Sequence, residues 1–271
     1  MTILLVLIGS WLGGSNGMIF AFLIAAAMNF GSYWMSDKIV LMMYKAKEVS
    51  ASESPKLHGI VTRVASQAQL PVPKLYIIPG DTPNAFATGR NPEHAAIAAT
   101  EGILRSLSDD ELEGVIAHEM AHVKNRDILT GTIVATMAGA ITMIARMAGW
   151  SMMFGGNRSD RKDSGGAGEL LLLMLAPIAA TLVQLAISRS REFAADEGSA
   201  QMTGRPLSLA NALQKLEQSA ARLPLEQATP STAHMFIVNP LTGGGIMKLF
   251  STHPPTEERI ARLQHIAMGQ A

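Results

Sequence analysis

The chain has 271 residues, of which 48% are hydrophobic and only 16% charged, whereas soluble domains average about a quarter charged. Part of the chain is therefore expected to lie in a lipid bilayer. Lys+Arg and Asp+Glu both number 22, so the balanced charge gives no sign of the basic patch that a nucleic-acid partner requires. Cysteine is absent, which excludes disulfides and leaves histidine and carboxylates as the metal ligands.

Residues 1–36 carry no charge and are predicted to form an N-terminal membrane segment. The glycine-rich break at 13–17 separates Ile3 to Leu12 from Met18 to Met35. At about 1.5 Å per residue the first piece covers about half of a hydrocarbon core of about 30 Å. We therefore expect one full span preceded by a short helix. A signal peptide fits less well because no basic residue precedes the run, and a misplaced start that truncates the first helix is a third reading.

Residues 37–127 are predicted to form the first part of an α+β domain. The pattern of apolar and turn-forming residues indicates a helix at 55–69 and strands at 74–78, 85–88 and 95–99. A further helix begins after Ser108, because Ser108 and Glu111 form a capping-box pattern and acidic residues suit the positive end of the helix dipole.

Two more uncharged runs, Ile128 to Ala145 and Leu170 to Ser188, are marginal to adequate membrane spans. They predict a membrane hairpin at 128–188 with a polar loop at 151–169, and a pair of buried core helices in a soluble fold is the alternative. Residues 189–271 are polar and mostly helical, with a Pro/Gly-rich stretch at 223–245. The predicted fold class is α+β, mainly helical, with a small sheet and transmembrane helices.

The run His118-Glu119-Met120-Ala121-His122 carries the clearest chemistry. Residues four apart lie on one helix face, with Cβ atoms about 5–6 Å apart, so both imidazoles can bind one zinc ion. Glu119 lies beside them, where a carboxylate can take a proton from an activated water and pass it to a leaving amine. A surface helix with two unrelated histidines is the alternative, and an apolar stripe upstream of the motif disfavours it.

A catalytic zinc site needs a third protein ligand and one open position. Glu192 is the best candidate, and Asp196 follows one helical turn later, where it can accept the Nδ1–H of a metal-binding histidine. A solvated helix face is the alternative for this pair. His122 precedes one apolar segment and Glu192 follows the next, so a transmembrane hairpin would bring the two halves of the site together.

At these residues the sequence closely resembles the HtpX group of membrane zinc peptidases, within the M48 family of gluzincins. The resemblance covers nearly the whole chain. It is carried by the stretches 29–34, 83–89, 118–127, 188–196 and 251–255. The resemblance implies a gluzincin-like peptidase domain with one Zn²⁺ per chain. It also implies a bacterial endopeptidase that acts on unfolded or damaged membrane proteins in quality control and stress response. Relatives usually have a complete first membrane helix, whereas here that helix is short.

The same resemblance implies roles for individual residues. It implies that His118, His122 and Glu192 bind zinc and that Glu119 is the general base. It points to His253, in Thr-His-Pro-Pro, as a donor to the transition state, with a histidine that orders a loop as the alternative. Asn84 and the strand after it look like the edge that holds extended substrate by strand addition. The alternative for Asn84 is an Asx-turn.

Basic residues flank the expected spans unevenly. On the side of the motif these residues are Lys38, Lys45, Lys47, Lys124, Arg126, Arg189 and Arg191, whereas the hairpin loop has Arg158, Arg161 and Lys162. The positive-inside rule therefore predicts a multi-pass protein of the bacterial cytoplasmic (inner) membrane with the motif facing the cytoplasm. The expected partners are the bilayer and substrate proteins, and the sequence predicts no oligomeric state.

Two other classes of function compete with a peptidase. A non-catalytic membrane holdase or scaffold with a relic metal site is disfavoured because a purely structural zinc site would not need Glu119. A small transporter or channel is disfavoured because the spans contain no charged residue of the kind that marks a transport pathway.

Overall fold

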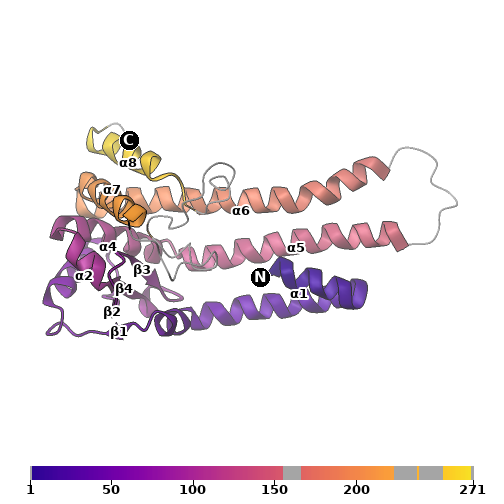
Figure 1. Cartoon of the computed structure of the whole chain (residues 1–271), viewed down its shortest axis with the longest axis horizontal. Coiled ribbons are helices and arrows are strands. Elements are labelled where there is room, and N and C mark those ends of the chain that lie inside the picture. Colours follow the sequence, from indigo (N-terminus) through magenta and orange to yellow (C-terminus); the bar gives the residue numbers. More distant parts are fainter. Residues whose placement is uncertain (1, 155–165, 223–236, 238–252, 270–271) are drawn as a thin grey trace. The chain divides into compact units, whose positions relative to one another are not determined.

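The computed structural model describes residues 2–154, 166–222, 237 and 253–269. The chain divides into two compact units (Figure 1), one formed by Met1–Tyr33 and Leu129–Ile187 and the other by Trp34–Ile128 and Ser188–Ala271. Residues 155–165 of the expected polar loop and nearly all of the Pro/Gly-rich stretch at 223–245 lie outside the described residues.

The first unit contains most of α1 (Thr2–Met43), nearly all of α5 (Asp127–Phe154) and the N-terminal part of α6 (Gly166–Thr203). The expected break in α1 is present, because Gly13 and Gly14 have non-helical backbone angles. The chain folds back there so tightly that a Cβ on Gly9 would lie 2.4 Å from the Gly17 carbonyl oxygen. A short helix before a longer one is therefore confirmed, although the second helix continues to Met43 rather than ending near Met35.

The predicted loop at 151–169 is too long at both ends. Residues 151–154 belong to α5 and residues 166–169 belong to α6. The apolar pattern of Met152 to Phe154 continues that of the preceding span, and a helix that has already formed gains one backbone hydrogen bond with each added residue. Pro and Gly mark where a helix can end, but they do not fix the residue at which it does.

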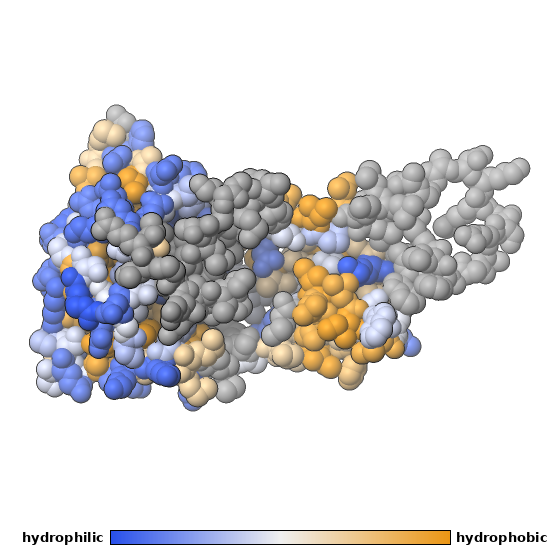
Figure 2. Space-filling model, in the orientation of Figure 1, coloured by the Kyte–Doolittle hydropathy of each residue, from blue (hydrophilic) through white to orange (hydrophobic). Residues whose placement is uncertain are grey.

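Two described segments, Thr2–Gly31 and Asp127–Met147, are long and apolar enough to cross a membrane. Large apolar side chains in the first unit face outward, among them Trp11, Phe20 and Leu23. Figure 2 shows the corresponding hydrophobic surface in orange. The third expected span, Leu170 to Ser188, is helical within α6 and stays a prediction as a membrane segment.

The second unit is built on a four-stranded sheet in the order β1-β2-β4-β3. Its strands are β1 (Lys47–Glu48), β2 (Lys74–Ile78), β3 (Ala85–Thr88) and β4 (Ala96–Thr100). β2 and β4 are parallel, whereas β3 pairs antiparallel with β4 and forms one edge of the sheet. The strands predicted at 74–78 and 85–88 are confirmed, the strand predicted at 95–99 lies one residue later, and the two-residue β1 was not predicted.

Further helices belong to the second unit. They are α2 (Pro55–Ala68), α3 (Glu101–Ser106), α4 (Asp109–Lys124), α7 (Pro206–Arg222), α8 (Thr256–Ala267) and the 3₁₀ turn η1 (Pro92–His94). The capping box of Ser108 and Glu111 at the start of α4 is confirmed. α4 is buried along most of its length and packs against α2 and α7. The predicted fold class, mainly helical with a small sheet, is confirmed.

Close backbone approaches hold α6 and α7 against α4. A Cβ on Gly114 of α4 would lie 2.9 Å from the Leu209 backbone nitrogen of α7. From α6, the Ser199 hydroxyl donates to the Gly114 carbonyl at 2.7 Å, and a Cβ on Gly198 would lie 2.9 Å from that of Ala121. The motif helix is therefore fixed on two sides by neighbours that come from distant parts of the sequence.

We predict opposite effects of Gly→Ala at two helical positions. Gly114→Ala should destabilise the protein by about 1–3 kcal/mol, the usual cost of overpacking. Gly59→Ala in α2 should stabilise it by up to about 1 kcal/mol through helix propensity, because a Cβ there would meet only an Arg63 side-chain nitrogen at 3.9 Å. Chemical denaturation in detergent measures both, and equal shifts would contradict the close packing of α4.

Candidate metal centre

His118 and His122 project from the same face of α4, as their spacing predicts. Their Nε2 atoms lie 3.1 Å apart. Glu192 of α6 completes the group, with its carboxylate oxygens 3.8 Å from His118 Nε2 and 3.6 Å from His122 Nε2. One ligand atom from each residue lies within 4.8 Å of the others. These three side chains can therefore hold one metal ion.

Both imidazoles have a carboxylate on the ring nitrogen that faces away from this centre. His118 Nδ1 lies 2.9 Å from Asp196 Oδ1, the contact that the sequence predicts. His122 Nδ1 lies 2.6 Å from Asp127 Oδ2. A carboxylate acceptor at Nδ1 favours the tautomer in which Nε2 carries the lone pair. The donor set therefore fits a metal ion that binds between the two Nε2 atoms.

Sequence reasoning missed Asp127. It lies beyond the C-cap of α4, where Arg126 has a left-handed backbone (φ 54°) that turns the chain back. Arg191 of α6 donates to the Asp127 carbonyl and holds this turn in place. Burial disfavours charge on the His122 imidazole, but the hydrogen bond to Asp127 and the negative charges of Glu192 and Glu119 outweigh it and raise the pKa of His122 to about 9.

Arg259 is the second residue that sequence reasoning missed. Its side chain comes from α8 and is only 1% exposed. Its Nε and one Nη bond both oxygens of Asp196, at 2.8 and 2.6 Å, and the other Nη donates to the Ile237 carbonyl at 2.8 Å. The same guanidinium lies 3.5 Å from Glu192 Oε2. No local spacing could reveal it, because its partner is 63 positions away in the sequence.

These contacts keep the buried acids charged. Burial raises the pKa of a carboxyl group, but the positive charge and hydrogen bonds of Arg259 reverse the effect and lower the pKa of Asp196 to about 2. For Glu192, burial is again outweighed, here by His253, His122 and Arg259, and its pKa lies well below the usual value. The site therefore presents a carboxylate to a cation at any physiological pH.

Glu119 is buried beside the two histidines and touches the sheet. Its Oε2 accepts the backbone N–H of Ala87 in β3 at 2.8 Å. The register shows why this amide is available. The Thr100 N–H donates to the Asn84 carbonyl, and backbone groups alternate in direction along a strand. The backbone groups of Phe86 and Thr88 therefore face β4, whereas those of Ala85 and Ala87 point away from it. The carboxylate next to the metal-binding face is therefore anchored to the edge strand.

The two remaining candidates, His253 and Asn84, both lie in the second unit. His253 is 8% exposed and its Nδ1 lies 3.0 Å from Glu192 Oε2, so it belongs to the immediate surroundings of the candidate metal ligands. Asn84 is buried at the start of β3, and its Oδ1 accepts the Ile237 N–H at 3.3 Å. The Asn84 side chain is thus engaged with the protein's own backbone at the end of the edge strand.

Comparison with known proteins agrees with this geometry. The model of Peptidase family M48 matches residues 51–267. The chain is 58% identical over 265 residues to the Protease HtpX homolog of Desulfatibacillum aliphaticivorans, which covers 97% of this chain and 85% of that protein. It is 56% identical over 268 residues to the Protease HtpX homolog of Pyrococcus furiosus, with 99% and 93% covered.

A solved structure shares the fold. The crystal structure of S. mikatae Ste24p matches with a TM-score of 0.62 at 19% identity and covers 97% of this chain. This chain spans 62% of the length of that structure. The family match, the two full-length relatives and the His118, His122 and Glu192 group lead to one conclusion: this chain belongs to peptidase family M48 and is a membrane metalloprotease.

Proposed function

We propose that this metalloprotease is a zinc-dependent endopeptidase that cleaves unfolded or damaged membrane proteins at the cytoplasmic face of the bacterial inner membrane. The observation that carries the proposal is the convergence of His118, His122 and Glu192, with both histidines held at Nδ1 by buried carboxylates. Nitrogen and carboxylate donors in this number match a catalytic zinc site, in which three protein ligands leave one position open. When bound, zinc supplies Lewis acidity that activates water and polarises the peptide carbonyl.

Glu119 is proposed as the general base. It follows His118 directly on α4, so its carboxylate lies next to the metal-binding atoms without belonging to the ligand group. The Ala87 N–H fixes one of its oxygens and leaves the other to accept a proton from the attacking water. The same carboxyl group then returns this proton to the leaving amine.

The free edge of β3 is proposed to bind the substrate. The backbone groups of Ala85 and the carbonyl of Ala87 point away from β4, so an extended peptide can pair with them by strand addition while the Ala87 N–H stays with Glu119. Asn84 is proposed to help orient the substrate at the start of this edge. His253 is proposed to donate to the oxygen of the tetrahedral transition state, because it lies in contact with the third ligand.

Substrate class follows from the geometry of an edge strand. A folded protein cannot present an extended segment to such an edge, whereas an unfolded loop or tail can. We propose that these segments belong to damaged membrane proteins and that the enzyme acts in quality control and stress response. Helices with apolar surfaces, Thr2–Gly31 and Asp127–Met147, support its retention in the same bilayer as its substrates.

Two carboxylate substitutions should separate catalysis from metal binding. With purified protein in detergent, zinc and unfolded casein, Glu119→Gln should lower the rate by about 10²–10⁴ while zinc content is unchanged, because only the base is lost. Glu192→Gln should lower zinc content, because it removes the third ligand. Cleavage is followed by gel and zinc by elemental analysis. Equal activity of Glu119→Gln and wild type would refute the role of Glu119, and unchanged zinc in Glu192→Gln would place the third ligand elsewhere.

Arg259 is proposed as a positioning residue for Asp196 and, through it, for His118. Arg259→Met should destabilise the protein by about 3–5 kcal/mol, because it leaves Asp196 buried without its partner, and should weaken zinc binding. Arg262→Met on the same helix should cost about 1 kcal/mol or less, since Arg262 is half exposed and pairs with Glu258 at the surface. Denaturation and zinc titration measure both effects.

Arg259→Lys should restore the positive charge but only part of the zinc affinity, since lysine cannot bond both Asp196 oxygens in the same way. Equal effects of the two methionine variants would contradict this role.

The orientation in the membrane has its own test. A green fluorescent protein fused after Ala271 should fluoresce, and alkaline phosphatase at the same point should be inactive, if the peptidase unit is cytoplasmic. The matched control is the same pair of reporters inserted at Asp160, where the opposite result is expected of a transmembrane hairpin. Phosphatase activity at the C-terminus would reverse the proposed orientation.

A further inference from the structure

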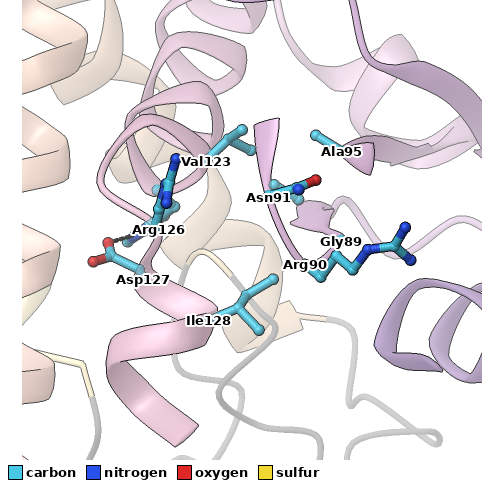
Figure 3. A pocket seen from close by; sticks show the side chains of 10 residues that line it. Gly89, Arg90, Asn91, Ala95, Val123, Arg126, Asp127 and Ile128 are labelled. Atoms are coloured by element: carbon cyan, nitrogen blue, oxygen red, sulfur yellow. Dashed lines mark hydrogen bonds and ion pairs between the residues drawn. The ribbon is translucent and has the colours of Figure 1, made fainter. Parts of the chain in front are cut away.

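A small cavity of about 30 Å³ lies beside the candidate metal centre (Figure 3). Its walls come from the end of β3 and the loop that follows, and from the junction of α4 and α5. They are formed by Ala87, Gly89, Arg90, Asn91, Ala95, His122, Val123, Arg126, Asp127 and Ile128. None of the sequence motifs pointed to this cavity, because its two sides are separated by a stretch that includes β4 and α3.

We propose that this cavity is a specificity pocket that receives one small, uncharged side chain of the substrate, from a residue next to the bond that is cut. The proposal rests on the proposed function. Ala87 and His122 both line the cavity, and the Ala87 amide also holds Glu119. The pocket therefore adjoins both the base and a metal ligand, and only residues adjacent to the reacting carbonyl reach this position.

The size and the chemistry of the walls select the side chain. A volume of about 30 Å³ accommodates roughly two water molecules, which is enough for the side chain of Ala or Ser and too little for an aromatic ring. Ala95, Val123 and Ile128 contribute aliphatic surface. The Asp127 carboxylate is already engaged with His122, so it is not left to bind a basic substrate residue.

The wall opposite α4 is built so that it does not yield to a larger group. Gly89 has φ +121°, and a Cβ there would lie 2.1 Å from the His94 carbonyl oxygen, so the loop passes in close contact with its own backbone. Asn91 caps the next turn by accepting the His94 N–H at 3.0 Å. Arg90 turns its guanidinium away from the other labelled side chains (Figure 3) and lies 5.1 Å from the centre of the Trp34 ring.

The test changes the pocket and reads the cleavage sites. Full-length protein in detergent with zinc is incubated with unfolded casein, and the peptides formed are mapped by mass spectrometry. Val123→Ala in α4 and Ile128→Ala in α5 each enlarge the pocket, so that the failure of one variant to fold leaves the other. Val72→Ala is the matched control, because Val72 is exposed between two prolines and does not line the pocket. Glu119→Gln gives the background of fragments.

We expect wild type and Val72→Ala to favour Gly, Ala and Ser at one position flanking the cut bond. Each enlarged variant should accept Val, Leu or Met at that position about tenfold more often relative to Ala, the usual scale for one or two methyl groups in a tight pocket. Preferences at other positions should not change. Three results would overturn the proposal. The first is a wild type without a size preference at either flanking position, and the second is unchanged profiles in both enlarged variants. The third is a preference for Asp or Glu, which would assign the pocket to Arg126.

Failure of the proposed function would give a different result. Fragments that persist at full rate in Glu119→Gln would show that Glu119 is not the base, whatever the profile of the wild type. Binding provides a second readout of the pocket that needs no turnover. Zinc-loaded Glu119→Gln should bind the cleaved casein sequence, as a fluorescent peptide, about tenfold more tightly with Ala than with Phe at the selected position. Equal binding of the two peptides would overturn the pocket assignment.

Discussion

The ion pair between Asp196 and Arg259 is the contact on which the geometry of the metal centre depends. It is buried almost completely and joins α6 to α8, and Asp196 at the same time contacts His118 on α4. A buried carboxylate without a cation is costly, and charge repulsion among neighbouring acids adds to that cost. Arg259 offsets both costs, because it pairs with Asp196 and also lies close to Glu192. One guanidinium thus allows a dense group of acids to remain ionised where a metal ion must bind.

Helix packing converts this electrostatic arrangement into fixed distances. α4 carries two of the candidate ligands and α6 carries the third, so the separation of the helices sets the size of the centre. That separation is small because Gly198 approaches Ala121 and Ser199 bonds the Gly114 carbonyl. A side chain at Gly198 would push α4 and α6 apart, and small displacements at a metal centre are enough to lose a ligand. The smallest residues of the interface are therefore as much a part of the site as its charged ones.

The edge strand β3 lies next to both the proposed base and the cavity. The Ala87 amide holds the Glu119 carboxylate, and the side chain of the same residue lines the cavity beside His122. In the proposed function, a peptide that pairs with this edge would lie beside the proposed base Glu119, the two candidate histidine ligands and the cavity.

The sequence by itself determined most of the features that depend on near neighbours in the chain. These features include the i, i+4 histidines on a capped helix, the three longer strands and the glycine break in α1, because helix and strand periodicities and turn preferences act over a few residues. Glu192 in α6 could also be predicted, because two apolar runs of span length suggest a hairpin that brings the chain back to the same side as His122.

Only the tertiary structure decided what holds and surrounds those residues. Asp127 reaches His122 through a left-handed turn at Arg126, a conformation that a non-glycine residue rarely adopts and no pattern announces. Arg259 finds Asp196 across 63 positions and lies close to His118 across 141, and the cavity forms between a loop and a helix end that are far apart in the chain. A buried charged side chain needs a partner of opposite charge or a hydrogen bond. Which residue provides it depends on how the helices pack, and the local sequence spacing does not show this.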